Sequence, residues 1–204
     1  MRKNLKEYFW KNNKADNSYL YLFNSIRRIC EIYDTSTSSH LDVGCGNGYM
    51  TKKISRFFKH TTAIDPSNSA IIQAKKKYKG KIQFYKQKVS KIKRKYDFVT
   101  LIEVIEHVYS PDDLLNSLKL ITNKNSRILI TTPYHGFIKN LLIIISGKFD
   151  LHFSPLWEHG HIKFFSLDTL KKLVLRNNYQ IERFFYSGRI FPISKSIIFI
   201  IKKK

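Results

Sequence analysis

Residues 41–48, with the sequence L-D-V-G-C-G-N-G, decide the fold that we expect for this chain. Leu41 and Val43 form a short apolar run, and Gly44, Gly46 and Gly48 follow at alternating positions. After the glycines, apolar residues recur at the spacing of a helix. The stretch therefore predicts a strand, a tight turn and a helix, with a backbone that a ligand can approach closely.

The spacing of the glycines indicates which ligand this turn would hold. A dinucleotide fingerprint, G-x-G-x-x-G, would need glycine at position 49, where the chain has Tyr49. The observed D-x-G-x-G-x-G resembles the S-adenosylmethionine loop of class I methyltransferases, and the Asp42 carboxylate would suit a ligand that carries an ammonium and a sulfonium. The alternative is a glycine-rich turn without a ligand. The resemblance implies cofactor-binding roles for Asp42, Gly44, Cys45, Gly46, Asn47 and Gly48.

A second acidic residue supports a ligand at this loop. Thr61–Ile64 is a β-prone run that ends in Asp65, at the distance from the first glycine that a βαβ unit requires. A carboxylate at the carboxyl end of the second strand can accept both hydroxyls of a ribose. Pro66 and Ser67 then open a helix that we expect at Asn68–Tyr78, with Ser67 or Asn68 as its N-cap. The alternative for Asp65 is an ordinary helix-capping acid.

Length and composition favour one domain in a reducing compartment. The chain has 204 residues, of which 43% are hydrophobic, so a single full core is expected. No apolar segment follows the basic start, which argues against a secretory signal. With only Cys30 and Cys45, the expected location is the cytoplasm. The longest apolar stretch, Leu141–Ile145, is too short to span a bilayer.

The formal net charge of +22 has several interpretations. It would suit nucleic acid or an anionic membrane surface. Lysine greatly outnumbers arginine, however, and the lysines are spread over the chain rather than gathered in one stripe with aromatic residues. We favour solvated charge that reflects compositional drift, with peripheral contact to an anionic membrane as the second interpretation and nucleic acid as the least favoured.

Beyond residue 40, strand and helix patterns alternate. This alternation predicts an α/β fold, a doubly wound Rossmann-like sheet of seven strands that is mostly parallel, with the last strand antiparallel. Residues 1–39 are expected to be a helical lead-in, and residues 1–204 a single domain. The expected later strands are Ile82–Tyr85, Phe98–Ile102, Arg127–Thr132, Tyr179–Tyr186 and Lys195–Lys202, with helices at Asp112–Ile121 and Leu167–Asn177.

Residues 134–165 interrupt the alternation after the fifth strand. Connections of this length usually carry function, and this one lies at the carboxyl edge of the sheet, where ligands bind in such folds. It contains an apolar helix-like run, Phe137–Ile145, followed by Trp157, His159 and His161. We interpret the insertion as a cover over the substrate.

The whole stretch from His40 onward resembles class I methyltransferases, and within them the branch of the ubiquinone-biosynthesis O-methyltransferases. The matching segments are L-D-V-G-C-G-N-G, A-I-D-P-S, Y-D-F-V-T-L-I-E-V-I-E-H-V, L-I-T-T-P and G-H-I-K-F-F-S. The resemblance implies S-adenosyl-L-methionine as the cofactor, with Asp65 and Pro66 beside the ribose and Ile102 and Glu103 at the methionine end. Lys88 and Val89 would face the adenine, although many relatives have Asp where this chain has Lys88.

Glu103, Glu106 and His107 form an E-x-x-E-H segment that resembles a cluster associated with a divalent cation in the quinol methylases. Carboxylates with one imidazole would suit Mg²⁺, but the same segment occurs in relatives without a metal, and we predict no metal. His107 is a candidate general base, because imidazole titrates near neutral pH. His161 is a second candidate for orienting or deprotonating an acceptor hydroxyl, with Trp157 as a cover and His135 as a weaker candidate.

The function that we predict is methyl transfer from S-adenosylmethionine to a small molecule, with oxygen as the favoured accepting atom. The apolar insertion beside lysines would suit a lipid-soluble acceptor reached at a membrane surface, and a sugar or polyketide hydroxyl also fits. Two alternatives remain. An RNA methyltransferase would explain the charge but lacks an N-P-P-Y-type motif after the fourth strand, and a non-catalytic module would bind the cofactor without turnover.

Overall fold

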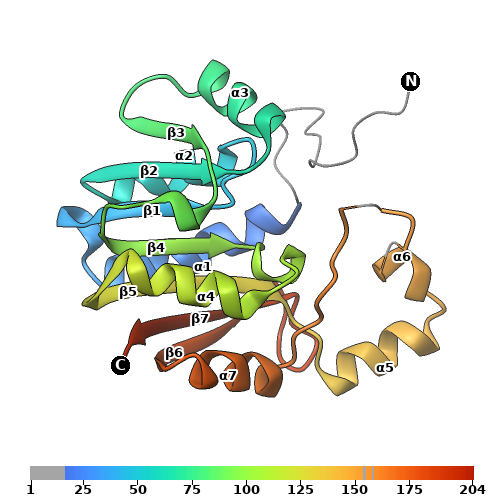
Figure 1. The fold of residues 1–204 in the computed structure, drawn as a ribbon. Helices are drawn as coiled ribbons and strands as arrows, with labels where there is room; N and C mark the ends of the chain where they lie inside the picture. Colours follow the sequence, from blue (N-terminus) through green and yellow to red (C-terminus); the bar gives the residue numbers. More distant parts are fainter. Residues whose placement is uncertain (1–16, 154, 158) are drawn as a thin grey trace.

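The computed structural model describes residues 17–153, 155–157 and 159–204. In this part of the chain, seven strands form one sheet in the order β3-β2-β1-β4-β5-β7-β6 (Figure 1). The strands are β1 (Ser39–Val43), β2 (His60–Asp65), β3 (Ile82–Lys86), β4 (Tyr96–Ile102), β5 (Thr122–Pro133), β6 (Tyr179–Ser187) and β7 (Ser196–Lys203). Strands β1 to β5 pair in parallel, whereas β7 is antiparallel to both β5 and β6. The predicted fold class is confirmed.

The helices that cover the sheet form two layers. In the described residues, α1 (Asn17–Ile32) and α2 (Tyr49–Ile54) pack on one face, and α4 (Pro111–Leu120) and α7 (Leu167–Arg176) pack on the other. The remaining helical elements are α3 (Asn68–Lys77), α5 (Phe137–Ile145), α6 (Phe149–Phe153) and the short 3₁₀ helices η1 (Thr35–Thr37), η2 (Ser55–Phe57), η3 (Val89–Lys91) and η4 (Ile105–His107). Of the predicted N-terminal lead-in, α1 lies in the described residues, and residues 1–16 lie outside them.

Strand β7 is covered by helices on both of its faces. Its run Ile197–Ile201 is completely buried, because the strand lies between β5 and β6 and carries helices on both sides. Such continuous apolar runs are typical of strands covered on both faces. Apolar and polar residues therefore do not alternate along β7, because neither face of the strand is exposed to solvent.

Side-chain caps fix where two of the helices begin. Ser67 accepts a hydrogen bond from the Ala70 amide at the start of α3, as predicted. Ser166 and Thr169 form a reciprocal capping box at the start of α7. These caps set the positions at which the chain leaves the carboxyl edge of the sheet.

The insertion between β5 and α7 leaves the sheet and returns to the same place. Tyr134 and Phe165 form an isolated parallel bridge, so the two ends of the insertion lie side by side. Between them, α5 confirms the helix predicted at Phe137–Ile145, and α6 follows it. Figure 1 shows both helices standing away from the sheet. None of the helices in the described residues is both long and apolar enough to cross a membrane.

Candidate active site

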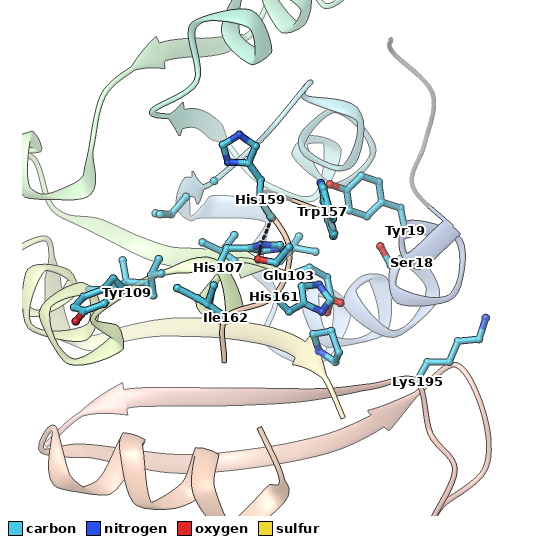
Figure 2. A pocket seen from close by; sticks show the side chains of 18 of the residues that line it. Ser18, Tyr19, Glu103, His107, Tyr109, Trp157, His159, His161, Ile162 and Lys195 are labelled. Carbon is cyan, nitrogen blue, oxygen red and sulfur yellow. Dashed lines mark hydrogen bonds between the residues drawn. The ribbon is translucent and has the colours of Figure 1, made fainter. Parts of the chain in front are cut away.

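A cavity of about 1620 Å³ opens at the carboxyl ends of the parallel strands. Its lining includes the last residues of four strands, Val43, Asp65, Ile102 and Pro133, together with residues of α1 and of the insertion. This edge is where ligands bind in open α/β sheets, because loops from neighbouring strands meet there. Figure 2 shows how side chains from these separate elements surround the space.

The glycine loop is held close to β2 by backbone hydrogen bonds. The amides of Gly44 and Cys45 donate to the Ile64 carbonyl at 2.8 and 3.0 Å. Gly44 lines the cavity with a φ of +73°, and a Cβ built on it would lie 2.6 Å from Val104 Cγ2. No larger residue fits this position without displacing Val104. Cys45, Gly46, Asn47 and Gly48 form the turn behind Gly44 and are not part of the cavity wall.

Asp42 lies beneath the loop rather than in the cavity. Its carboxylate is 2% exposed and accepts hydrogen bonds from the hydroxyls of Thr51 in α2 and Thr100 in β4. Burial raises its pKa to about 6, although the two hydroxyls act in the opposite direction. The carboxylate joins α2 to the sheet, and the contact of Asp42 with the cofactor stays a prediction.

Asp65 belongs to both the loop and the cavity wall. Its Oδ2 accepts from the Gly46 amide at 2.9 Å, and its Oδ1 accepts from the Ser67 amide at 2.8 Å. A carboxylate has about four acceptor sites, so the two amides alone do not fill the acceptor capacity of Asp65. Next to it, Pro66, Gln87, Lys88 and Val89 line the same part of the cavity. Gln87 was not among the residues predicted from the sequence.

Ile102 and Glu103 line the cavity at the end of β4. Glu103 has a φ of 54°, which is uncommon for a residue other than glycine, and such strain is frequent at functional sites. Its amide donates to Thr131 Oγ1, and that hydroxyl donates back to Glu103 Oε1 at 2.8 Å. The carboxylate is therefore fixed in direction by β5.

His107 and His161 come together although 54 positions separate them in the sequence. Their ring centroids are 4.8 Å apart, and Trp157 stands edge-on to His107 at 5.9 Å. His107 Nδ1 lies 3.1 Å from the His159 carbonyl and 3.2 Å from that of Gly160. A carbonyl oxygen can only accept, so Nδ1 carries the proton, and in neutral His107 the basic lone pair is on Nε2. Figure 2 shows this contact.

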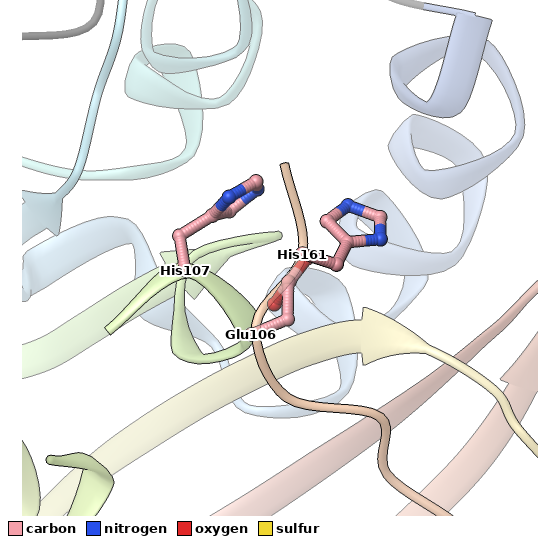
Figure 3. Close-up of side chains that lie close together, drawn as sticks. All are labelled: Glu106, His107 and His161. Atoms are coloured by element: carbon pink, nitrogen blue, oxygen red, sulfur yellow. The ribbon is translucent and has the colours of Figure 1, made fainter. Parts of the chain in front are cut away.

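Glu106 is completely buried below the two histidines, and Figure 3 shows the three side chains together. Neither of its carboxyl oxygens has a hydrogen-bond partner among the described residues. Burial raises its pKa well above the usual range, and the charge of Glu103 adds to this effect. Glu106, His107 and His161 each offer a ligand atom within 4.8 Å of the others. Two imidazoles and a carboxylate suit Zn²⁺ or a similar transition metal better than Mg²⁺.

The other candidate histidine lies elsewhere. His135 is 7% exposed and packs among aromatic side chains, including Phe153 and Phe164. Burial lowers its pKa to about 4. It holds the insertion together and is not part of the cavity wall.

Three groups of cavity residues had no signal in the sequence. Ser18, Tyr19 and Tyr21 reach the cavity from α1, in the segment where no motif was recognised. Lys139 reaches it from α5, and Arg189 and Lys195 reach it from the turn between β6 and β7. Only the tertiary fold brings these segments to the same edge.

Residues 5–183 match the family model described as "Methyltransferase domain". The chain belongs to this family. It is 30% identical, over 85% of its length and 68% of the relative's, to the mitochondrial ubiquinone biosynthesis O-methyltransferase of Schizosaccharomyces pombe. It is 24% identical to the ubiquinone biosynthesis O-methyltransferase of Glaesserella parasuis, covering 84% of this chain and 78% of that protein.

Solved structures show the same fold. An S-adenosylmethionine-dependent methyltransferase from Clostridium acetobutylicum aligns with a TM-score of 0.71 at 13% identity, covering 93% of each chain. Magnesium protoporphyrin IX methyltransferase from Synechocystis, with bound S-adenosylhomocysteine, aligns with a TM-score of 0.68 at 16% identity, covering 95% of this chain and 90% of that one. These structures support the fold, and the family match with the 30% identical relative identifies the protein as an S-adenosylmethionine-dependent methyltransferase. The resemblance noted in the sequence is confirmed.

Proposed function

We propose that this methyltransferase transfers the methyl group to a hydroxyl oxygen of an apolar small molecule. The observation that carries the proposal is that two carbonyls hold Nδ1 of His107, a residue of the cavity wall, so that the basic lone pair of the neutral ring is on Nε2. The names of the related ubiquinone O-methyltransferases support oxygen as the accepting atom. The apolar side chains of Leu142, Ile143 and Trp157 in the cavity wall support an apolar acceptor.

We assign the cofactor to the part of the cavity between Gly44 and Val89. Asp65 would accept the ribose hydroxyls, and the wall at Lys88 and Val89 would face the adenine. Gly44 would let the methionine part pass close to the backbone, and Glu103 would lie near its ammonium group. In this arrangement the sulfonium methyl would point toward His107 and His161.

The chemical step is an in-line displacement, for which alignment is the main requirement. As His107 Nε2 takes the proton of the acceptor hydroxyl, the oxygen forms a bond to the methyl carbon. The carbon–sulfur bond breaks, and its electron pair neutralises the sulfonium. His161 would orient the hydroxyl from the other side. Glu106, His107 and His161 also fit a divalent cation, which would take His107 Nε2 as a ligand atom. In that case the cation, by lowering the pKa of the acceptor hydroxyl, would replace His107 as the group that promotes loss of the proton.

We also propose that α5 and α6 touch an anionic membrane surface. Phe137, Ile145 and Leu151 are 78%, 72% and 80% exposed, so the insertion presents apolar side chains to its surroundings. Lys148 lies between the two helices and would meet anionic headgroups. A lipid-soluble acceptor could then enter the cavity without crossing water.

The direct test uses methyl-labelled S-adenosylmethionine and a fractionated extract of the source cell. We expect label in a small-molecule fraction as a methyl ether. His107→Gln should reduce kcat by about 10²–10⁴-fold and leave the affinity for S-adenosylhomocysteine unchanged. His60→Gln, on an exposed residue at the start of β2, is the control. Label in RNA would favour an RNA methyltransferase, and cofactor binding without label in any fraction would favour a non-catalytic module.

A further inference from the structure

Three cations meet on one side of the cavity, away from the glycine loop. Lys139 comes from α5, and Arg189 and Lys195 come from the two ends of the β6–β7 turn. Lys195 reaches toward α1, where its Nζ lies 5.0 Å from the centroid of the Tyr21 ring (Figure 2). Two elements that are distant in the sequence therefore contribute positive charge to the same wall.

Within the described part of the chain, no ion pair neutralises these cations. Among the described residues, Lys139, Arg189 and Lys195 have no salt bridge, whereas Arg127, Arg176 and Lys202 each pair with a carboxylate elsewhere. The acid on this side of the cavity is Glu103, whose carboxylate is bonded to Thr131. Like charges that face a partly enclosed cavity repel one another, and a bound anion would relieve that repulsion.

Lys139 is the most strongly fixed of the three. Its Nζ donates to the Tyr134 carbonyl at 2.7 Å and to the Lys195 carbonyl at 3.2 Å. An ammonium has three donors, so one remains for a ligand. Burial is the main cause that lowers the pKa of Lys139 to about 8; the charge of Glu103 opposes it, and the charges of Arg189 and Lys195 act in the same direction as burial.

The β6–β7 turn is itself held in place. The Lys195 amide donates to the Ser187 carbonyl at 2.9 Å, and Ser194 Oγ donates to the Arg189 carbonyl at 2.9 Å. The wall beside the cations is apolar, with Ile193, Leu142 and Ile143. A ligand that contacts both the three cations and this apolar wall would need an anionic group attached to an apolar body.

We infer that Lys139, Arg189 and Lys195 form a subsite for a carboxylate or phosphate group on the methyl acceptor, so that the acceptor is an amphiphilic anion. This inference rests on the proposed function, because it assigns the far side of the same cavity to the acceptor. The three residues are specificity-determining and take no part in the methyl transfer itself.

Binding of simple amphiphiles tests the subsite without the natural acceptor. Calorimetry with the full chain saturated with S-adenosylhomocysteine would compare octyl phosphate, octanoate, octanol and inorganic phosphate. We expect at least one of the two anionic amphiphiles to bind about tenfold or more tightly than octanol, as charge-assisted hydrogen bonds allow. Whichever of octyl phosphate and octanoate binds more tightly identifies the group that is recognised.

Two double variants, each of which removes two positive charges, distinguish binding at the subsite from attraction of the anion by the net positive charge of the protein. Arg189→Gln/Lys195→Gln should remove most of the preference for the anion, whereas Lys75→Gln/Lys76→Gln, on exposed residues of α3, should keep it. Equal binding of octanol and both anions, an equal loss in the two double variants, or inorganic phosphate binding as tightly as octyl phosphate would overturn the inference. Failure to bind S-adenosylhomocysteine would instead overturn the proposed function.

Discussion

The role assigned to Asp65 can be tested with Asp65→Asn. In the wild type, one carboxylate oxygen receives the Gly46 amide and the other receives the Ser67 amide. Asparagine has a single oxygen, so one of these amides would face an NH₂ group that cannot accept its hydrogen bond. The negative charge that would receive the ribose hydroxyls is lost as well. The substitution therefore acts on the loop and on the ligand contact together.

The expected magnitude follows from these contacts. Hydrogen bonds to a charged group contribute roughly 1.5–3 kcal/mol each, which corresponds to a loss of about 10–150-fold in affinity for S-adenosylhomocysteine. The unpaired amide should also lower the free energy of unfolding by about 1–3 kcal/mol. Calorimetry gives the first quantity, and urea unfolding in the absence of ligand gives the second.

Asp97→Asn is the matched control. Asp97 Oδ2 accepts from the Ser39 amide at 2.9 Å and from the Ser39 hydroxyl at 2.7 Å, at the opposite edge of the sheet. This variant should lose some stability and keep its affinity for S-adenosylhomocysteine. Unchanged affinity in Asp65→Asn would remove Asp65 from the cofactor site, and equal losses of affinity in the two variants would show that general destabilisation explains the effect.

Three further outcomes are expected. Gly44→Val, which places side-chain atoms against Val104, should reduce S-adenosylhomocysteine affinity more than tenfold while circular dichroism still shows a folded chain. Burial lowers the pKa of His40 to about 3. The free energy of unfolding should therefore fall as the pH drops below 6.5, by at most about 1.4 kcal/mol per pH unit. In urea titrations at several pH values, His40→Gln should make this dependence on pH weaker. Ile144→Ser/Ile145→Ser should reduce sedimentation with anionic vesicles, and an unchanged bound fraction would contradict the proposed membrane contact.

The sign of the His40 prediction depends on which state takes up the proton. The unfolded chain binds it near pH 6.5, whereas the folded chain holds the ring neutral between Thr61 and Thr100 until about pH 3. Protonation therefore favours unfolding across this range. The carboxyl of Asp42, with a pKa raised to about 6, acts in the opposite direction between pH 6 and 4 and makes the net slope shallower.

Local patterns were sufficient to predict the framework. The strand before the glycines, Asp65 at the end of β2 and the cap at Ser67 each depend on a few neighbouring residues, and the structure has all three. The antiparallel β7 was also predictable, because two β-prone runs after the last helix have a short connection. Such features follow from periodicity and turn chemistry, which are local properties of the chain.

Contacts between distant segments were not predictable in the same way. The pairing of Glu106 with His161 depends on the return path of the insertion, where the amides of Ile162 and Lys163 donate to the Glu106 carbonyl at 3.0 Å. The sequence instead grouped Glu106 with Glu103, its near neighbour in the chain. No sequence periodicity predicts such a path, because it is set by the packing of the long connection at residues 134–165.

The two halves of the cavity differ in how they are built, and this difference bears on the reaction. The half assigned to the cofactor is formed by strand ends and by a loop that is bonded to β2, so it exists before any ligand binds. The half assigned to the acceptor is formed by the insertion, whose helices α5 and α6 contribute no buried side chain. His107 joins the two halves, because the carbonyls of His159 and Gly160 fix its proton on Nδ1. In the neutral ring the basic lone pair is then on Nε2, so the segment that encloses the acceptor half of the cavity also sets the tautomer of the proposed base.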